Sequence, residues 1–353
     1  HSLVVLPNYA QEAPLDVTQE LQLVQEVEVP PNAPKHLWAW VQSMGLDESE
    51  TRLVLFDSRM TRISILDPRN FELLATWGKQ GRGPGELANY SAWVTMKKGE
   101  VVFCQDFKVS YFSVDGRFLD KDVPLLGRAG WYSLSTHQSV GIDSSGSLYY
   151  LAGQNAANWE IRCRASDGRD RVVFSQTAAR LFQIPDKGGI AFGTHPDGSS
   201  VVLFGHKPFM IKFDTRGNVK WVREFLKDLP SGVANQIRDE YEKAIKKNVP
   251  YPWSAFWSDS TYTVFTLPID WTRERIGKPG VLYFFFNSKT GRLMKVSYPK
   301  QNVVERPSKG ENDVGTHTLY APWAVARSQG YLYAFCYNNS RLVKYKLLWA
   351  QPR

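Results

Sequence analysis

Short runs of alternating apolar and polar residues, each closed by a turn sequence, recur along most of the chain. The clearest stretch is residues 53–87, LVLFDSRMTRISILDPRNFELLATWGKQGRGPGEL. Within it, segments 53–56, 63–66 and 71–74 have the two-residue period of a β-strand. The Asp-Pro-Arg-Asn sequence at 67–70 has the composition of a turn. The pattern predicts three short antiparallel strands followed by a glycine-rich loop.

The same arrangement of strands and turns is repeated further along the chain. The six copies begin at Leu53, Val101, Leu148, Val201, Thr261 and Leu332. The turn after the third strand begins at Asp67, Asp115, Asp167, Asp214 and Asn287. These turns are about 50 residues apart, except for a last step of about 73. Units of about 50 residues with four short strands are typical of a β-propeller, so we predict an all-β fold, a six-bladed β-propeller.

The two ends of the chain and the long step complete this prediction. Residues 21–29, LQLVQEVEV, alternate like a strand without a hairpin partner nearby, and the sixth copy lacks a fourth strand. We therefore expect the ring to be closed by this N-terminal strand. Apolar residues at helical spacing in 226–248 predict a helical insertion at about 226–250, between blades 4 and 5. The expected organisation is an extended segment at 1–20 and a single propeller domain at 21–353.

The composition agrees with a folded β-rich protein. Hydrophobic residues make up 43% and charged residues 22%, and the aromatic content of 13% favours strands. No apolar run approaches the roughly 18 residues of a transmembrane segment. The sequence begins with His1 rather than Met, so either a signal peptide was removed or the chain was shortened in another way. We expect an exported protein, periplasmic, cell-surface or secreted. Cys104, Cys163 and Cys336 lie in apolar strand patterns and are expected to be buried and free.

The first copy resembles the NHL repeat, a family of six-bladed propellers with short blades. Its matching residues are Phe56-Asp57-Ser58 with Thr61-Arg62-Ile63, and the loop GKQGRGPGEL at 78–87. NHL units show a D-S-x-N-x-R-I pattern and a G-x-G-P-G-x-F loop. Residues 338–342, NNSRL, are a second, partial match, and the other copies keep only the strand rhythm. The resemblance implies the architecture but no activity, because propellers carry many unrelated functions.

The resemblance also implies where a partner would bind. In such rings, the loops between blades and between second and third strands gather on one face, which is the usual binding face. The cations expected on this face are Lys79, Arg82, Lys108, His206, Lys207, Arg273, Arg275 and Lys278. With a net charge of +8, they predict a basic mouth for a protein partner, a larger assembly or a small anionic ligand. The alternative is ordinary solvated loop charge, partly neutralised by Asp106, Asp270 and Glu274.

An enzyme is the second hypothesis. Some related propellers are lyases or lactonases that hold a divalent metal on the central axis, so a metal-dependent lyase or lactonase-type hydrolase is the alternative function. That chemistry needs inward-facing ligands from several blades at one register. His137, His195 and His317 each follow a threonine but lie at different distances from the next turn glycine, so no histidine ring is expected.

The motif search favours a protein without catalytic activity. The sequence has no G-x-S-x-G, no H-E-x-x-H and no P-loop motif. We therefore expect a non-catalytic binding or assembly module, a scaffold, with no cofactor. The pI near 9.2 raises the question of nucleic acid. However, the aromatic residues at 253–262 are explained by inward strand positions, and a nucleic-acid partner is not expected.

Overall fold

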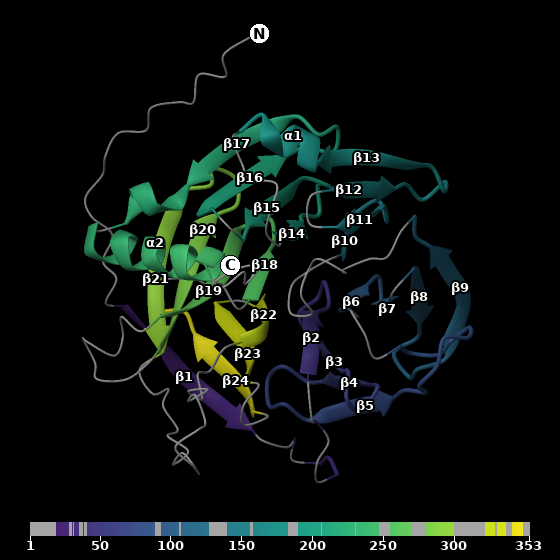
Figure 1. Cartoon of the computed structure of the whole chain (residues 1–353). Helices are drawn as coiled ribbons and strands as arrows, with labels where there is room; N and C mark the ends of the chain where they lie inside the picture. The colour runs from purple at the N-terminus through teal and green to yellow at the C-terminus, as the bar shows by residue number, and fades with distance from the viewer. Residues whose placement is uncertain are drawn as a thin grey trace.

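Six blades of short β-strands stand in a ring around a central axis (Figure 1). The computed structural model describes residues 19–27, 30, 32–34, 38, 41–88, 93–105, 107–126, 140–155, 158–182, 190–205, 207–229, 231–246, 255–269, 280–299, 322–328, 330–336 and 341–348. Within them, four sheets have four strands each, and an eight-stranded sheet covers two neighbouring blades. The prediction of an all-β, six-bladed β-propeller with very little helix is confirmed.

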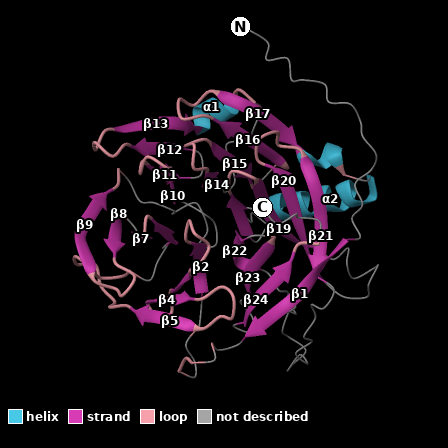
Figure 2. Cartoon of the chain, turned by 180° about the vertical axis from the view of Figure 1, so that it is seen from behind, coloured by secondary structure: helices cyan, strands magenta, loops and turns pink. Residues whose placement is uncertain are grey.

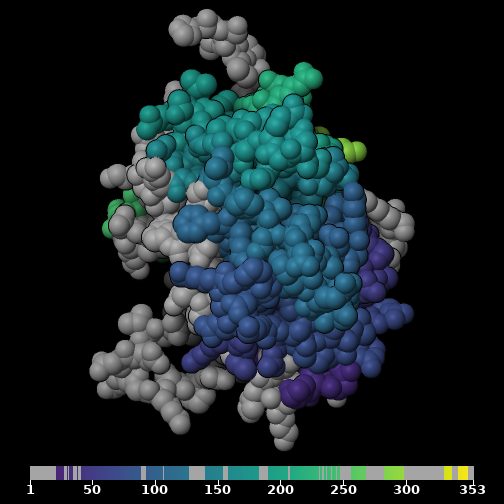
Figure 3. Space-filling view, turned by 90° about the vertical axis from the view of Figure 1, so that its right-hand side faces the viewer, coloured from purple at the N-terminus to yellow at the C-terminus, as the bar shows by residue number. Residues whose placement is uncertain are grey.

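Each blade is an antiparallel meander that runs outward from the axis. Blade 1 contains β2 (Val41–Leu46), β3 (Leu53–Asp57), β4 (Arg62–Leu66) and β5 (Leu73–Trp77), and blade 2 contains β6 (Trp93–Lys97), β7 (Glu100–Gln105), β8 (Lys108–Phe112) and β9 (Phe118–Pro124). Blade 3 contains β10 (Val140–Ile142), β11 (Leu148–Asn155), β12 (Asn158–Arg164) and β13 (Asp170–Ser175), and blade 4 contains β14 (Ile190–Thr194), β15 (Ser200–Phe204), β16 (Phe209–Phe213) and β17 (Val219–Glu224). Blade 5 contains β18 (Ala255–Ser258), β19 (Tyr262–Ile269), β20 (Gly280–Asn287) and β21 (Leu293–Pro299), and blade 6 contains β22 (Pro322–Ser328), β23 (Tyr331–Cys336) and β24 (Arg341–Lys346). Figure 3 shows the rim of the ring from the side, with successive blades as bands of colour from purple through blue to teal.

The N-terminal strand β1 (Gln19–Val27) is hydrogen-bonded on both sides. It runs antiparallel to β24, with Val27 opposite Leu342, and parallel to the end of β21, with Gln19 opposite Ser297. Figures 1 and 2 show it beside these two strands from opposite directions. This pairing links blades 5 and 6 into the eight-stranded sheet. The strand begins two residues before the predicted boundary at 21 and ends two residues before the predicted end at 29.

In the described part of the chain, helix is confined to connections between blades. The 3₁₀-helix η1 (Phe225–Asp228) and α2 (Ser231–Lys246) lie between β17 and β18. Ile237 and Tyr241 on α2 are buried in the apolar cluster that joins blades 4 and 5. A five-residue helix, α1 (Gln176–Arg180), follows blade 3 and is too short to give a periodic signal in the sequence. Among the described residues, no helix is both long and apolar enough to cross a membrane.

The fourth strand of blade 1 lies later than its sequence predicts. Segment 71–74 was expected to be a strand, but β5 begins at Leu73. Phe71 has a positive φ of 61° and donates its backbone N–H to the Asp67 carbonyl at 2.8 Å, so it belongs to the turn. Its ring is nevertheless buried, in the apolar cluster between blades 6 and 1. Phe71 therefore packs in the core although it lies in a turn. Its apolar side chain fits a two-residue alternation, so the sequence pattern assigned it to a strand.

Blades are joined at the turns between their third and fourth strands. A Cβ added to Gly116 in blade 2 would lie 2.4 Å from Trp77 of blade 1, and one added to Gly291 in blade 5 would lie 2.7 Å from Trp221 of blade 4. The outer strand of one blade thus places a tryptophan against the turn glycine of the next. These glycines meet a packing requirement as well as the positive φ of the turn.

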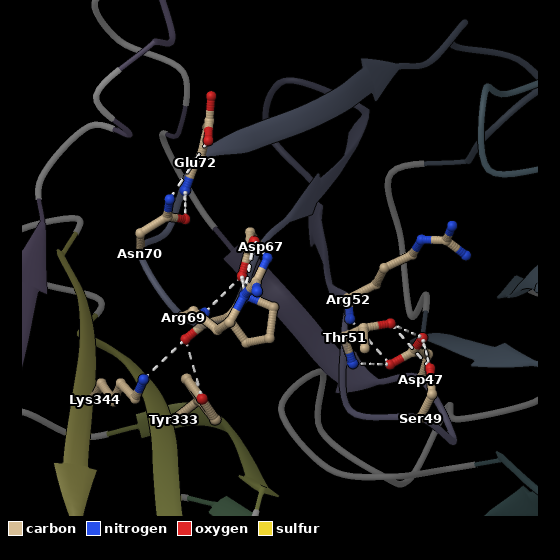
Figure 4. A network of polar contacts seen from close by, with 11 residues as sticks. Asp47, Ser49, Thr51, Arg52, Asp67, Arg69, Asn70, Glu72, Tyr333 and Lys344 are labelled. Carbon is tan, nitrogen blue, oxygen red and sulfur yellow. Dashed lines mark hydrogen bonds and ion pairs between the residues drawn. The ribbon is translucent and has the colours of Figure 1, made fainter.

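Buried lysines make a second kind of contact between blades. Lys344 Nζ and the Tyr333 hydroxyl of blade 6 both donate to the Pro68 carbonyl in the turn of blade 1, each at 3.1 Å (Figure 4). In blade 4, Lys212 Nζ donates to the Ser288 carbonyl in the equivalent turn of blade 5 at 2.9 Å. Both lysines lie on the third strand of their blade. Each therefore satisfies a backbone acceptor of the neighbouring sheet, as buried polar groups require.

Candidate functional site

The predicted basic mouth is described in part. His206, Arg273, Arg275 and Lys278, together with the carboxylates Asp106, Asp270 and Glu274, lie outside the described residues. Of the other predicted residues, Lys79, Arg82 and Lys108 come together around the loop at 78–88. Lys207 lies apart from them in blade 4, with its Nζ 5.9 Å from the centre of the Phe209 ring.

The loop at 78–88 is held by its own backbone. Leu87 donates to the Lys79 carbonyl at 2.8 Å, and Gly81 donates to the Leu87 carbonyl at 3.0 Å. The buried Gln105 side chain fastens the end of the loop, since it accepts from Ala88 N–H and donates to the Glu86 carbonyl at 2.9 Å. The backbone of the 78–88 loop between blades 1 and 2 is therefore held in a defined conformation.

The glycine-rich loop surrounds a carboxylate of its own chain. Gly83 N–H donates to Glu86 Oε2 at 3.0 Å, and Lys79 Nζ lies 2.7 Å from Glu86 Oε1. A Cβ on Gly81 would lie 2.0 Å from Glu86 Oε2, so a larger residue there would displace the carboxylate. The pKa of Glu86 is held below its ordinary value, first by the Lys79 ammonium and then by the Gly83 N–H. The charge of Lys79 is thus already balanced within the loop.

Lys108 connects this loop to blade 2. Its Nζ donates to the Gly83 carbonyl and to Asp122 Oδ2, both at 2.9 Å. Two of the predicted cations therefore form ion pairs, with Glu86 and Asp122, whereas Arg82 is exposed. The sequence contains both partners but does not show which cations they meet, because Lys108 and Asp122 are paired only after β8 and β9 form.

Three exposed apolar side chains on the same face were missed by the sequence analysis. Met60, in the loop between β3 and β4, is 42% exposed, and Phe107, between β7 and β8, is 55% exposed. Leu126, just after β9, is 56% exposed. A phenylalanine at the tip of a tight connection was the available signal, since turns between strands favour small polar residues. The strand rhythm hid it, because Phe107 stands between two apolar runs.

A buried polar group lies on the opposite face, between blades 4 and 5. His195 is 1% exposed; its Nε2 is 2.7 Å from Ser258 Oγ, and Lys212 Nζ is 3.2 Å from its Nδ1. Because the lysine donates to Nδ1, we assign the proton of the neutral imidazole to Nε2, which donates to Ser258. Burial, and then the charge of Lys212, lower the pKa of His195 to about 3. The histidine, which the sequence analysis considered as a metal ligand, takes part in the contact between two blades.

Histidine, cysteine and carboxylate side chains are the candidates for a metal site. Among the described residues, no group of three or more His, Cys, Asp or Glu side chains is arranged to hold a metal ion. Cys104 and Cys163 are buried, as expected, and burial raises the pKa of the Cys163 thiol. His137 and His317 lie outside the described residues. The expected absence of a cofactor therefore stays a prediction, and a divalent metal on the axis stays part of the alternative hypothesis.

Comparisons with known proteins support the fold. No family model and no curated protein matches the sequence. A member of the DUF4221 family from Bacteroides vulgatus superimposes with a TM-score of 0.58 at 11% identity, over 93% of this chain and 97% of that chain. The β-propeller domain of Cps50 (Swd1) from Myceliophteria thermophila gives 0.50 at 10% identity, over 92% and 99%. The chain is a six-bladed β-propeller.

The function of this propeller does not follow from its structural relatives. A regucalcin from Agrobacterium tumefaciens, described as a calcium-binding protein, also superimposes with a TM-score of 0.50 at 9% identity, over 94% of this chain and 95% of that chain. Identities this low show the fold alone, and propellers with the same fold carry different functions. Without a matching family model, the NHL resemblance is not confirmed.

Proposed function

We propose that the propeller is a non-catalytic binding module that recognises a partner through the face carrying the 78–88 loop. The observation that carries this proposal is the internal bonding of the loop, which leaves Arg82 exposed on a fixed backbone. A surface that is already ordered loses less conformational entropy on binding. An exposed arginine favours a partner with acidic groups.

The local structure of blade 1 supports the proposal that this blade is similar to an NHL repeat. Asp57 Oδ1 accepts the backbone N–H groups of Arg59 and Met60 at 2.9 and 2.8 Å. The aspartate of the D-S-x-N-x-R-I pattern would therefore be required to shape the loop between the second and third strands. The proposal extends to this blade only, because the other copies contain at most a partial match to the motif.

The proposal is tested by reversing charges on the two faces. A partner captured from native cells is titrated against the chain with Arg82→Glu, Lys207→Glu and Arg273→Glu combined. We expect its affinity to fall by about tenfold or more, because close charge pairs in an interface become repulsive. The control combines Arg117→Glu, Arg169→Glu and Arg216→Glu, three exposed arginines in turns of the opposite face. Equal losses in both variants, or in neither, would contradict recognition through the loop face.

The enzyme hypothesis has its own measurement. Purified chain is dialysed against metal-free buffer and analysed for calcium and zinc. A stoichiometric metal that survives dialysis would replace the binding module with the metal-dependent lyase or hydrolase as the leading proposal.

A further inference from the structure

Exposed apolar and basic side chains alternate along the loops of blades 1 and 2. Met60, Phe107 and Leu126 are 42%, 55% and 56% exposed, and Arg59 and Arg82 are exposed beside them. We call these five residues the Phe107 strip. Isolated apolar residues on a surface are ordinary, but neighbouring ones on a binding face indicate an interaction site.

Contacts between neighbouring loops connect the segments that carry the strip. The loop of Arg59 and Met60 touches the start of the glycine-rich loop, because a Cβ on Gly78 would lie 2.3 Å from the Thr61 carbonyl. The other side of that loop meets blade 2 where Lys108 Nζ donates to the Gly83 carbonyl. The next contact is from Leu125 N–H to the Phe107 carbonyl, at 2.6 Å. The path therefore runs from blade 1 through Arg82 and Phe107 to Leu126.

Each part of the strip rests on a fixed backbone. Asp57 holds the N–H groups of Arg59 and Met60, and the Tyr150 hydroxyl accepts from the N–H of Leu126 at 3.2 Å. The Tyr150 hydroxyl in turn donates to Asp170. Because this backbone is already ordered, less conformational entropy is lost when a partner binds.

The charge of the strip is positive. The neighbouring cations Lys79 and Lys108 are balanced by Glu86 and Asp122. Among the described residues, no carboxylate forms an ion pair with Arg59 or Arg82. The strip therefore offers two arginines without a described counter-charge and three apolar side chains.

We propose that the Phe107 strip binds an extended segment of a partner protein in which acidic residues alternate with apolar ones. The carboxylates would pair with Arg59 and Arg82, and the apolar side chains would cover Met60, Phe107 and Leu126. Single-stranded nucleic acid fits less well, because bases stack on aromatic rings and two of the three apolar residues are aliphatic. This inference rests on the proposed binding function and names the partner's chemistry and contact residues.

The test uses peptides as probes of the whole chain. A phage-displayed library of random twelve-residue peptides is selected on immobilised protein, and an enriched peptide is then synthesised with a fluorescent label and titrated. We expect enriched peptides to contain Asp or Glu next to Phe, Leu or Met. Phe107→Ala should weaken binding about tenfold or more, as for a residue at the centre of an interface. Arg82→Gln should weaken it and reduce its dependence on salt.

Matched controls separate the strip from the rest of the surface. Leu181→Ala removes an apolar residue that is 82% exposed after blade 3, and Arg117→Gln removes an exposed arginine on the opposite face. Neither change should alter peptide binding. A labelled twelve-residue oligouridine is titrated in parallel.

Several results would overturn the inference. These are the absence of enriched peptides, enrichment of neutral or basic peptides, equal binding by Phe107→Ala and the wild-type chain, or tighter binding of oligouridine that the same substitutions abolish. A further outcome is that Phe107→Ala has no effect on peptide binding while the triple charge reversal still abolishes binding of the native partner. In that case the inference about the Phe107 strip is wrong and the proposed function stands.

Discussion

Two glycines in the same turn sequence, Asp-Gly-Arg, lie in different surroundings. Gly116 and Gly168 have positive φ angles of 90° and 86°. A Cβ on Gly116 would meet Trp77 at 2.4 Å, whereas one on Gly168 would meet nothing within 4 Å. Both glycines meet the need of the turn for a positive φ. Gly116 in addition leaves room for a tryptophan of the neighbouring blade, and Gly168 does not.

We expect Gly116→Ala to lower the free energy of unfolding by about 2–4 kcal/mol, which combines left-handed strain with overpacking against a tryptophan. Gly168→Ala should cost only the strain, about 1–2 kcal/mol. Urea unfolding followed by fluorescence measures both. If the two substitutions cost the same, the contact between Gly116 and Trp77 contributes nothing to stability.

His195 makes stability depend on pH. Its pKa is about 3 in the folded chain, below the ordinary value of 6.5, so the folded state holds the neutral form. As the pH falls below 6.5, the unfolded chain takes up a proton that the folded chain refuses, and stability is lost between pH 6.5 and 3. Between pH 7 and 5, this loss is roughly 2 kcal/mol.

Chemical denaturation at pH 7 and pH 5 checks this expectation. His195→Gln cannot take up the proton, so the variant should lose roughly 2 kcal/mol less than the wild-type chain over this range. The measurement compares how the free energy of unfolding changes with pH in the two proteins. A loss of stability that is the same at both pH values therefore does not affect it. An identical pH dependence in both proteins would show that His195 is not held neutral.

At the scale of elements, the N-terminal strand contains its own control. Leu21 on β1 is 1% exposed and packs in the apolar cluster of blades 5 and 6, whereas Val24 on the same strand is 49% exposed. Leu21→Ala should lower the free energy of unfolding by about 2–4 kcal/mol, and Val24→Ala by less than about 0.5 kcal/mol. Equal, small effects in urea unfolding would mean that β1 is not docked between β21 and β24.

The elements also show how far the sequence predicts this structure. Alternation located the second and third strands of the blades, and α2 lies within the segment where helical spacing was found. The alternation pattern predicted the start of β5 too early, because Phe71 is buried in the core but lies in a turn. It could not predict the contact of Trp77 with Gly116, since residues that meet between blades are far apart in the chain and belong to different copies.

The candidate site was predicted less completely than the fold. The cations Lys79, Arg82 and Lys108 were assigned to one surface from loop positions, and the structure brings them together. Their ion pairs were not predicted, because a carboxylate such as Asp122 reaches its partner only across paired strands. Phe107 was missed because composition alone does not distinguish an exposed aromatic residue from a buried one.

At the scale of the whole molecule, the propeller presents two faces to solvent. Six blades around an axis place their connecting loops on these two faces, and proteins with this architecture bind different partners. The proposal of a loop-face binding module uses only features of this chain, above all the fixed loop at 78–88. Export, expected from the sequence, has no structural observation behind it and stays a prediction.

The pairing of β1 with β21 and β24 also determines when during synthesis the ring can close. This strand is among the first described segments to leave the ribosome, yet its partners β21 and β24 are among the last. Translation proceeds at about 5–20 residues per second, so roughly 15 to 60 s separate the synthesis of β1 from that of β24. During this time blades 1–4 can form from their own strands, whereas β1 has no partner until β21 is made. The ring can close only after β24 is released, because β1 needs both strands.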